Sequence, residues 1–319
     1  MTIKDETDAY ENWRNLGTSV KKRKSYYGAA APEILHVTEG KKIKIGILTN
    51  GNLLHKCVNL NKKKYRFVDT CPLDSVIQGL TTTYCDSNVV QICMEQMLSP
   101  QVVEIVKQLA TGTTKLHTYK LRGEIYLSSN FEFRKTTLIN NTIRVECAMN
   151  AVNVLQYFLG DDFHSTCTTN ICDSKECDVT HQTLCSKTIP ININIIKKNG
   201  FKDLIQSAED CLMFNKCNFT TELSNILFID TCDCGTTSLL DIPLSVKFKY
   251  SSSSYLLRSA INFIPPIGKI DDFDKRIGHY TCLSRRVDGT WEVYNDLEKK
   301  KLTVSSNTII LPHLLIYSI

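Results

Sequence analysis

Residues 278–296 read GHYTCLSRRVDGTWEVYND, and this stretch decides the prediction of the fold. Asp288-Gly289 is a turn signal between two runs rich in aromatic and β-branched residues, which is the pattern of a β-hairpin. The first strand of that hairpin begins near His279, and the second ends near Asn295. Pairing of the two strands brings the imidazole alongside the carboxamide, so the stretch predicts a histidine held by an amide side chain.

A second stretch supplies a nucleophile that this histidine can serve. Residues 69–78 read DTCPLDSVIQ, and Pro72 suits the first turn of a helix. The helical spacing is carried by the apolar residues Leu73, Val76, Ile77 and Leu80. Cys71 therefore lies at a predicted helix N-terminus, where the helix dipole favours a thiolate. An isolated cysteine is more often a buried structural residue, but a catalytic thiol needs a base and an orienting group, and the hairpin offers both.

The order of the elements indicates the fold class. Periodic apolar residues predict further helices around residues 102–109 and 148–159. From about residue 163, Cys and Thr become frequent and short β-type runs appear at 190–196, 226–229, 244–248 and 255–263. Helices first and strands later predict an α+β protein and not a doubly wound sheet.

Composition indicates which partners and which cellular compartment we expect for the chain. It has 319 residues, 42 % of them hydrophobic, and a formal net charge of +5 that is spread along the sequence, so nucleic acid binding is not expected. No apolar run is long enough for a membrane-spanning helix, so no membrane partner is expected. Residues 1–10 are polar and do not resemble a signal peptide. We therefore expect the chain in the cytoplasm or the nucleus, with its 14 cysteines reduced and not joined in a disulfide framework.

The two stretches resemble the Cys and His boxes of the ubiquitin-specific proteases. The His box of that family is matched in order by Gly278, His279, Tyr280, Gly289, Trp291, Tyr294, Asn295 and Asp296. The Cys box is matched by Thr70, Cys71, Ser75 and Gln78. Asp69 and Asp74 stand where the family prefers Asn. The run Cys-x-Leu-Asp is also similar to the SUMO isopeptidase branch of the superfamily.

This resemblance implies a papain-like cysteine protease fold with Cys71 as nucleophile, His279 as base, Asn295 as the orienting group and Asp296 in a supporting role. The catalytic domain would span residues 41–319 after a polar arm at 1–40, with a helical thumb, β-rich fingers and a β-sheet palm at about 65–160, 161–235 and 236–319. The family often places an Asn five residues before the nucleophile, where this chain has Arg66. The backbone N–H of Cys71 can bind an oxyanion without a side chain.

A zinc site in the fingers is a further expectation from the resemblance, because family members often carry two C-x-x-C knuckles there. The candidate ligands here have wider spacings, and they are Cys172, Cys177, Cys211 and Cys217. Four thiolates in tetrahedral array would suit structural zinc. The alternative is a fingers region with reduced thiols and no metal. Catalysis itself would need no cofactor.

The function that the resemblance implies is a thiol-dependent isopeptidase, or deubiquitinase, that removes ubiquitin or a ubiquitin-like modifier through an acyl-enzyme. Ubiquitin is placed first. The mildly basic charge and the loss of acidic thumb residues point towards SUMO. The alternatives are a SUMO-specific isopeptidase, a catalytically weak pseudo-protease that binds a modifier, and a polyprotein protease of a mobile element or virus.

Overall fold

The computed structural model describes residues 43–54, 56–138, 140–170, 183–212, 219–266, 278–298 and 300–319. Within these residues, helices dominate the first half and strands the second, so the predicted α+β class is confirmed. The polar arm predicted at 1–40 lies outside the described part. None of the helices that the structure describes is both long and apolar enough to cross a membrane.

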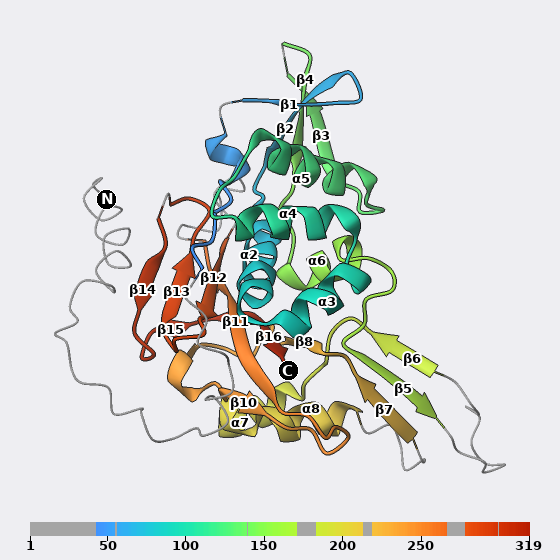
Figure 1. Cartoon of the computed structure of the whole chain (residues 1–319), viewed down its shortest axis with the longest axis vertical. Helices are drawn as coiled ribbons and strands as arrows, with labels where there is room; N and C mark the ends of the chain where they lie inside the picture. The colour runs from blue at the N-terminus through green and yellow to red at the C-terminus, as the bar shows by residue number, and fades with distance from the viewer. Residues whose placement is uncertain are drawn as a thin grey trace.

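Helices from the range predicted as the thumb cover one face of the largest sheet (Figure 1). The central helix α2 is buried along almost its whole length, because it packs against α4 on one side and against the sheet on the other. All three predicted helices are present, and the third begins at Ala151 because the Asn150 side chain accepts from the N–H of Val152. The helices are α2 (Cys71–Asp86), α3 (Asn88–Met97), α4 (Pro100–Ala110), α5 (Leu116–Ser128) and α6 (Ala151–Phe158).

A small sheet at the far end of the thumb was not predicted (Figure 1). Its strand order is β1-β2-β4-β3, and its parallel β2–β4 pair joins segments far apart in sequence. Strand β2 runs directly into the turn that precedes Cys71, so this sheet supports the start of α2. The strands are β1 (Val58–Leu60), β2 (Lys63–Val68), β3 (Arg134–Thr137) and β4 (Thr142–Glu146).

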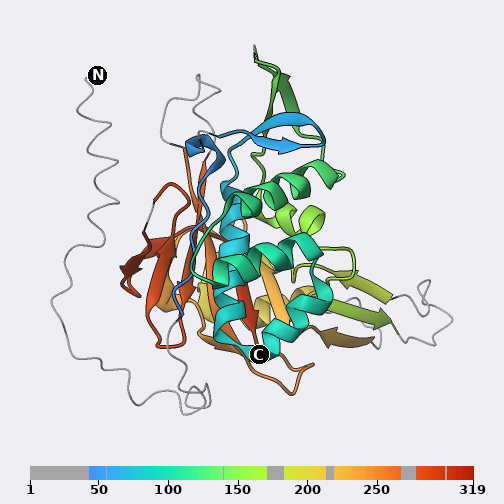
Figure 2. The ribbon, with the colours of Figure 1, turned by 45° about the horizontal axis from the view of Figure 1, so that its top comes forward.

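The largest sheet is antiparallel and contains most of the red and orange strands of Figure 2. Its order is β14-β13-β12-β11-β16-β8, with the short β10 paired to β11. We call it the palm sheet, although its strand β8 comes from the range predicted as fingers. The predicted hairpin is confirmed as β12 and β13, and Gly289 takes the left-handed φ of 77° that its turn requires. The strands are β8 (Ile226–Asp230), β10 (Ser245–Val246), β11 (Tyr255–Ile264), β12 (His279–Arg285), β13 (Trp291–Tyr294), β14 (Leu302–Val304) and β16 (Pro312–Ser318).

Side chains of the palm alternate between two hydrophobic cores, as strand geometry requires. Leu314 and Ile316 of β16 face the thumb helices, whereas Leu315 and Tyr317 face the opposite core. That second core contains helices α7 (Ile193–Asn199) and α8 (Leu204–Leu212). The remaining short elements of the described residues are η2 (Gly51–Leu53), η3 (Phe201–Asp203), η4 (Leu239–Asp241), β9 (Thr237–Ser238) and β15 (Ile309–Ile310).

A three-stranded sheet projects away from the body where fingers were predicted (Figure 1). It consists of β5 (Thr166–Asn170) between β6 (Thr183–Ser186) and β7 (Phe219–Leu223). The strand predicted at residues 190–196 is wrong, because helix α7 begins within it. The Asn192 side chain accepts from the N–H of Asn194, and this N-cap outweighs the alternating pattern of the run.

Candidate active site

The turn before Cys71 is held in place by a neighbouring loop. Asp69 adopts a left-handed φ of 57°, and the Asn52 side chain bridges it by accepting from its N–H at 3.1 Å and donating to its carboxylate at 2.8 Å. Gly51 approaches so closely that a Cβ there would lie 2.1 Å from the carbonyl oxygen of Phe67. Its N–H donates to Thr70 Oγ1 at 2.9 Å. The loop at 50–52 therefore fixes the geometry of the segment that carries Cys71.

Cys71 is the first residue of α2, as predicted, but its thiol is 3 % exposed. Burial raises the pKa of the thiol well above its usual value, and the nearby Asp296 raises it further. A hydrogen bond from the backbone N–H of Tyr280 to the sulfur acts in the opposite direction but is the weaker effect. The helix dipole favours a thiolate, but desolvation outweighs it in the resting state, so the group is a thiol.

The sulfur lies close to the strand that carries the predicted base, although among the described contacts no hydrogen bond joins Cys71 Sγ to the His279 ring. Tyr280 directly follows His279, which is the first residue of β12, so the start of α2 and the start of β12 meet at Cys71. The His279 side chain is 19 % exposed, and burial lowers its pKa, while the hydrogen bond to Asn295 raises it. His279 is thus a neutral imidazole at neutral pH.

Asn295 holds the ring of His279 from the other side. His279 Nε2 lies 2.8 Å from Asn295 Oδ1, which also accepts from the N–H of Leu297 at 3.1 Å. The backbone hydrogen bond identifies this atom as the amide oxygen, which can only accept hydrogen bonds. Nε2 therefore carries the ring proton and donates it. The ring nitrogen Nδ1 is then left with a lone pair that can accept a proton from a thiol.

Asp296 lies next to this pair, although it is more distant from the ring. Its Oδ1 is 3.5 Å from His279 Nε2, compared with 2.8 Å for Asn295 Oδ1. Asp296 Oδ2 accepts from Asn50 Nδ2 at 2.8 Å, and the carbonyl oxygen of Asp296 accepts from the Asn50 backbone N–H at 2.9 Å. Burial raises the pKa of Asp296 well above its usual value, and the neighbouring carboxyl of Asp74 raises it further.

Several residues at the site were missed by the sequence reasoning. Asn50 lies 246 residues from Asp296, and its only sequence signal was the turn formed with Gly51. Arg122 in α5 donates to Asp74 Oδ2 at 2.7 Å and to the carbonyl oxygen of Thr49 at 2.9 Å. A helical arginine at this position carries no local pattern that would have identified it.

Arg66 does not supply an oxyanion donor in this arrangement. It is exposed in the middle of β2, opposite Arg144 of β4 in the register of the parallel pair. Residues Tyr65 and Phe67 on either side of it face the core. The backbone N–H of Cys71 remains the candidate donor for an oxyanion.

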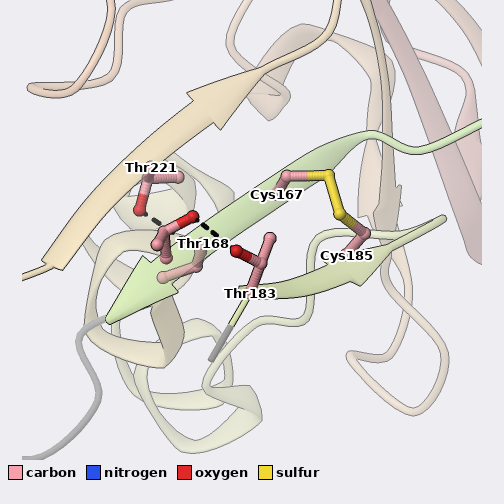
Figure 3. The surroundings of a disulfide bond; sticks show 6 residues. Cys167, Thr168, Thr183, Cys185 and Thr221 are labelled. Atoms are coloured by element: carbon pink, nitrogen blue, oxygen red, sulfur yellow. Dashed lines mark hydrogen bonds between the residues drawn. A yellow bond between two sulfur atoms is a disulfide. The ribbon is translucent and has the colours of Figure 1, made fainter. Parts of the chain in front are cut away.

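The fingers contain a disulfide in the structure. Cys167 and Cys185 stand directly opposite each other on β5 and β6, with a Cα–Cα distance of 4.0 Å (Figure 3). The expectation of reduced cysteines is wrong for this pair, because cross-strand neighbours bring the two sulfur atoms within bonding distance. Thr168, beside Cys167, shares a hydroxyl contact of 3.3 Å with Thr221 of β7.

The zinc site stays a prediction. Cys172, Cys177 and Cys217 lie outside the described residues, and Cys211 is a free, half-buried thiol on α8. In the part of the chain that the structure describes, no group of three or more His, Cys, Asp or Glu side chains is placed to hold a metal ion.

Comparisons with known proteins were made for sequence and for structure. No family model matches the chain. The 120.7 kDa protein in the NOF-FB transposable element of Drosophila melanogaster is 24 % identical over 312 residues, which cover 90 % of this chain and 28 % of that protein. The chain therefore spans little more than a quarter of that relative's length.

Two solved structures are similar at low identity. The SAGA DUB module of Ubp8, Sgf11, Sus1 and Sgf73 bound to monoubiquitin gives a TM-score of 0.41 at 12 % identity, covering 98 % of this chain and 74 % of that chain. The Saccharomyces cerevisiae PAN2 pseudoubiquitin-hydrolase gives 0.40 at 10 % identity, covering 88 % of this chain and 97 % of that chain. TM-scores and sequence identities this low carry no conclusion about the function of the chain.

Proposed function

We propose that this chain is a thiol-dependent isopeptidase of the ubiquitin-specific protease type. The observation that carries the proposal is the arrangement of Cys71 at the start of α2, the Tyr280 N–H on its sulfur, and His279 held at 2.8 Å by Asn295. These are the nucleophile, base and orienting group that acyl transfer by a cysteine requires.

The chemistry follows from the protonation states of these groups. His279 Nδ1 takes the proton of the Cys71 thiol, and the sulfur attacks the carbonyl carbon of the modifier's C-terminal residue. The oxyanion that forms is stabilised by the backbone N–H of Cys71. The imidazolium then gives its proton to the departing lysine amine, which leaves a thioester. Water, deprotonated by His279, releases the modifier acid and restores the thiol.

Burial of the thiol has a consequence for this cycle. At 3 % exposure, and with its pKa raised by burial, Cys71 rests in the protonated form. Proton transfer to His279 becomes favourable when a bound substrate brings the carbonyl against the sulfur and the developing charges are paired. We therefore propose that substrate binding, and not the free enzyme, generates the reactive ion pair.

The proposed substrate is a ubiquitin conjugate, and a SUMO conjugate is the second candidate. Support for ubiquitin comes from the Cys and His boxes of the sequence. Asp74 of the Cys-x-Leu-Asp run is the feature that favours SUMO. Cytoplasm and nucleus, where such conjugates occur, are the proposed locations.

Turnover of isopeptide-linked substrates tests this function. Ubiquitin dimers and SUMO dimers are incubated separately with the full chain, and we expect release of ubiquitin monomers that is lost in Cys71→Ala. Cys232→Ala is the control, because Cys232 is also a free thiol but is only half-buried and lies just after β8, away from His279 in sequence. Cleavage of SUMO dimers alone would replace ubiquitin by SUMO, and cleavage of neither would refute the proposal.

A further inference from the structure

Two carboxyl groups lie against each other below the candidate active site. Asp74 in the first turn of α2 is 2 % exposed, and Asp296 after β13 is 6 % exposed. Asp74 Oδ2 accepts from Thr70 Oγ1 at 2.6 Å and from Arg122 Nη1 at 2.7 Å. Asp296 Oδ2 accepts from Asn50 Nδ2 at 2.8 Å. The Oδ2 atom of each carboxyl group therefore accepts at least one hydrogen bond.

The other oxygen of each group has no donor. Both Oδ1 atoms are buried, and no N–H or O–H group of the described residues donates to either. The two carboxyl groups are nevertheless close enough for Asp74 to raise the pKa of Asp296 by charge repulsion and by a hydrogen bond to its protonated form. Two carboxylates cannot bond in this way, because both are acceptors, and a buried acceptor without a donor is costly. A single proton between the two Oδ1 atoms satisfies both.

We propose that Asp74 and Asp296 share one proton, and that this neutral bridge positions the start of α2 against the end of β13, which carries Asn295. The inference rests on the proposed function only where it links this bridge to catalysis. Neither carboxyl touches the substrate in this proposal, so both are positioning residues.

The surrounding groups place the proton on Asp296. The Asn52 N–H donates to Asn50 Oδ1 at 2.9 Å, which fixes the Asn50 amide so that its NH₂ group points to Asp296 Oδ2. The guanidinium of Arg122 lies 2.7 Å from Asp74 Oδ2, so the negative charge of the pair is best compensated on the Asp74 side. Asp296 Oδ1–H then donates to Asp74 Oδ1, and every oxygen of the pair takes part in a hydrogen bond.

The charge of the buried cluster is balanced in this state. One carboxylate, on Asp74, faces one guanidinium, on Arg122. Loss of the shared proton would add a second negative charge that no further cation compensates among the described contacts of the pair. The other titratable groups that act on this cluster are Cys71, His279, Asp69, Tyr119, Tyr126 and Cys147.

The bridge joins four segments that are distant in sequence. Asn50 belongs to the loop that holds the Cys71 turn, Asp74 to α2, Arg122 to α5 and Asp296 to the end of the hairpin. Repulsion between two ionised carboxyls would separate α2 from the hairpin and so move Cys71 relative to His279. Activity should accordingly decline as the pH rises past the raised pKa of Asp296 and the shared proton is lost.

Infrared spectroscopy of the full chain tests the shared proton directly. The protein is labelled with ¹³C in its Asp carboxyl groups, so that the C=O stretch of a protonated Asp is identified by its isotope shift. At neutral pH we expect one protonated Asp carboxyl in the unaltered protein and none in Asp74→Asn or Asp296→Asn. In either variant the new amide donates to the remaining carboxylate, so the fold is retained.

Asp69→Asn is the matched control. It is the same substitution two residues before Cys71, but Asp69 is outside the pair, so the protonated band should persist. Absence of the band from the unaltered protein, or its persistence in Asp74→Asn, would overturn the shared proton. The infrared measurement does not require the protein to cleave a substrate. A band in a protein that cleaves no conjugate would support the pair and refute the isopeptidase, and turnover without a band would do the reverse.

Discussion

Replacement of Asn295 by Ala should slow the reaction without unfolding the protein. The substitution removes the acceptor that lies 2.8 Å from His279 Nε2. This hydrogen bond matters most when the ring becomes an imidazolium, and a hydrogen bond to a charged group contributes about 1.5–3 kcal/mol. The expected loss in kcat/KM is therefore about ten- to a hundredfold, which corresponds to about 1.4–2.7 kcal/mol at the transition state. Asp296 cannot fully replace the amide, because its Oδ1 lies 3.5 Å away.

The assay is steady-state cleavage of an isopeptide-linked ubiquitin substrate by three variants. Asn295→Asp should retain activity, because a carboxylate can accept the same hydrogen bond from the ring. Asp296→Asn is the comparison at the neighbouring position, and it keeps a hydrogen-bonding side chain of the same shape. A larger loss for Asp296→Asn than for Asn295→Ala would refute the assignment of Asn295 as the orienting group.

Three further outcomes follow from the same geometry. His279→Ala should abolish turnover while the melting temperature stays unchanged, because the partly exposed ring contacts Asn295 and lies outside the core; unfolding of the variant would assign His279 a structural role. Arg122→Met should lower the free energy of unfolding by about 3–5 kcal/mol in urea titrations, because it leaves the buried Asp74 carboxylate without its cation, and a loss below 1 kcal/mol would contradict this. Stability should also depend on pH through Asp296. Its pKa is raised on folding, so the folded chain holds the extra proton above the usual carboxyl pKa of about 3.9, and the free energy of unfolding falls with rising pH by about 1.4 kcal/mol per unit until the raised pKa is passed. Urea titrations at a series of pH values above the usual carboxyl pKa should show this slope in the unaltered chain and lose it in Asp296→Asn, and equal slopes in both would contradict it.

The features predicted well from the sequence are those encoded locally. Pro72 and the apolar spacing after it mark α2, and Asp288-Gly289 marks the β12–β13 hairpin. The order of helices and strands then gives the α+β class. Each of these signals lies within about a dozen residues, where propensity and periodicity operate.

The features missed from the sequence depend on contacts between distant segments. The contact of Asn50 with Asp296 joins the two ends of the described chain, and Arg122 reaches Asp74 across 48 residues. The raised pKa of Cys71 was also not predicted, because a helix N-terminus can be read from the sequence but the burial that outweighs its dipole cannot. The small thumb sheet escaped prediction for the same reason, since its parallel β2–β4 pair is formed by residues about 80 positions apart.

The measurement that tests the account most directly is peptide mapping of the adduct formed with a ubiquitin probe that carries a C-terminal electrophile. The described part of the chain offers nine free cysteines, so the site of labelling discriminates among many thiols. We predict that mass spectrometry finds the ubiquitin remnant on Cys71, that His279→Ala labels much more slowly, and that Cys71→Ala is not labelled. Labelling of another cysteine, or unchanged labelling of Cys71→Ala, would contradict the assignment of Cys71 as the nucleophile.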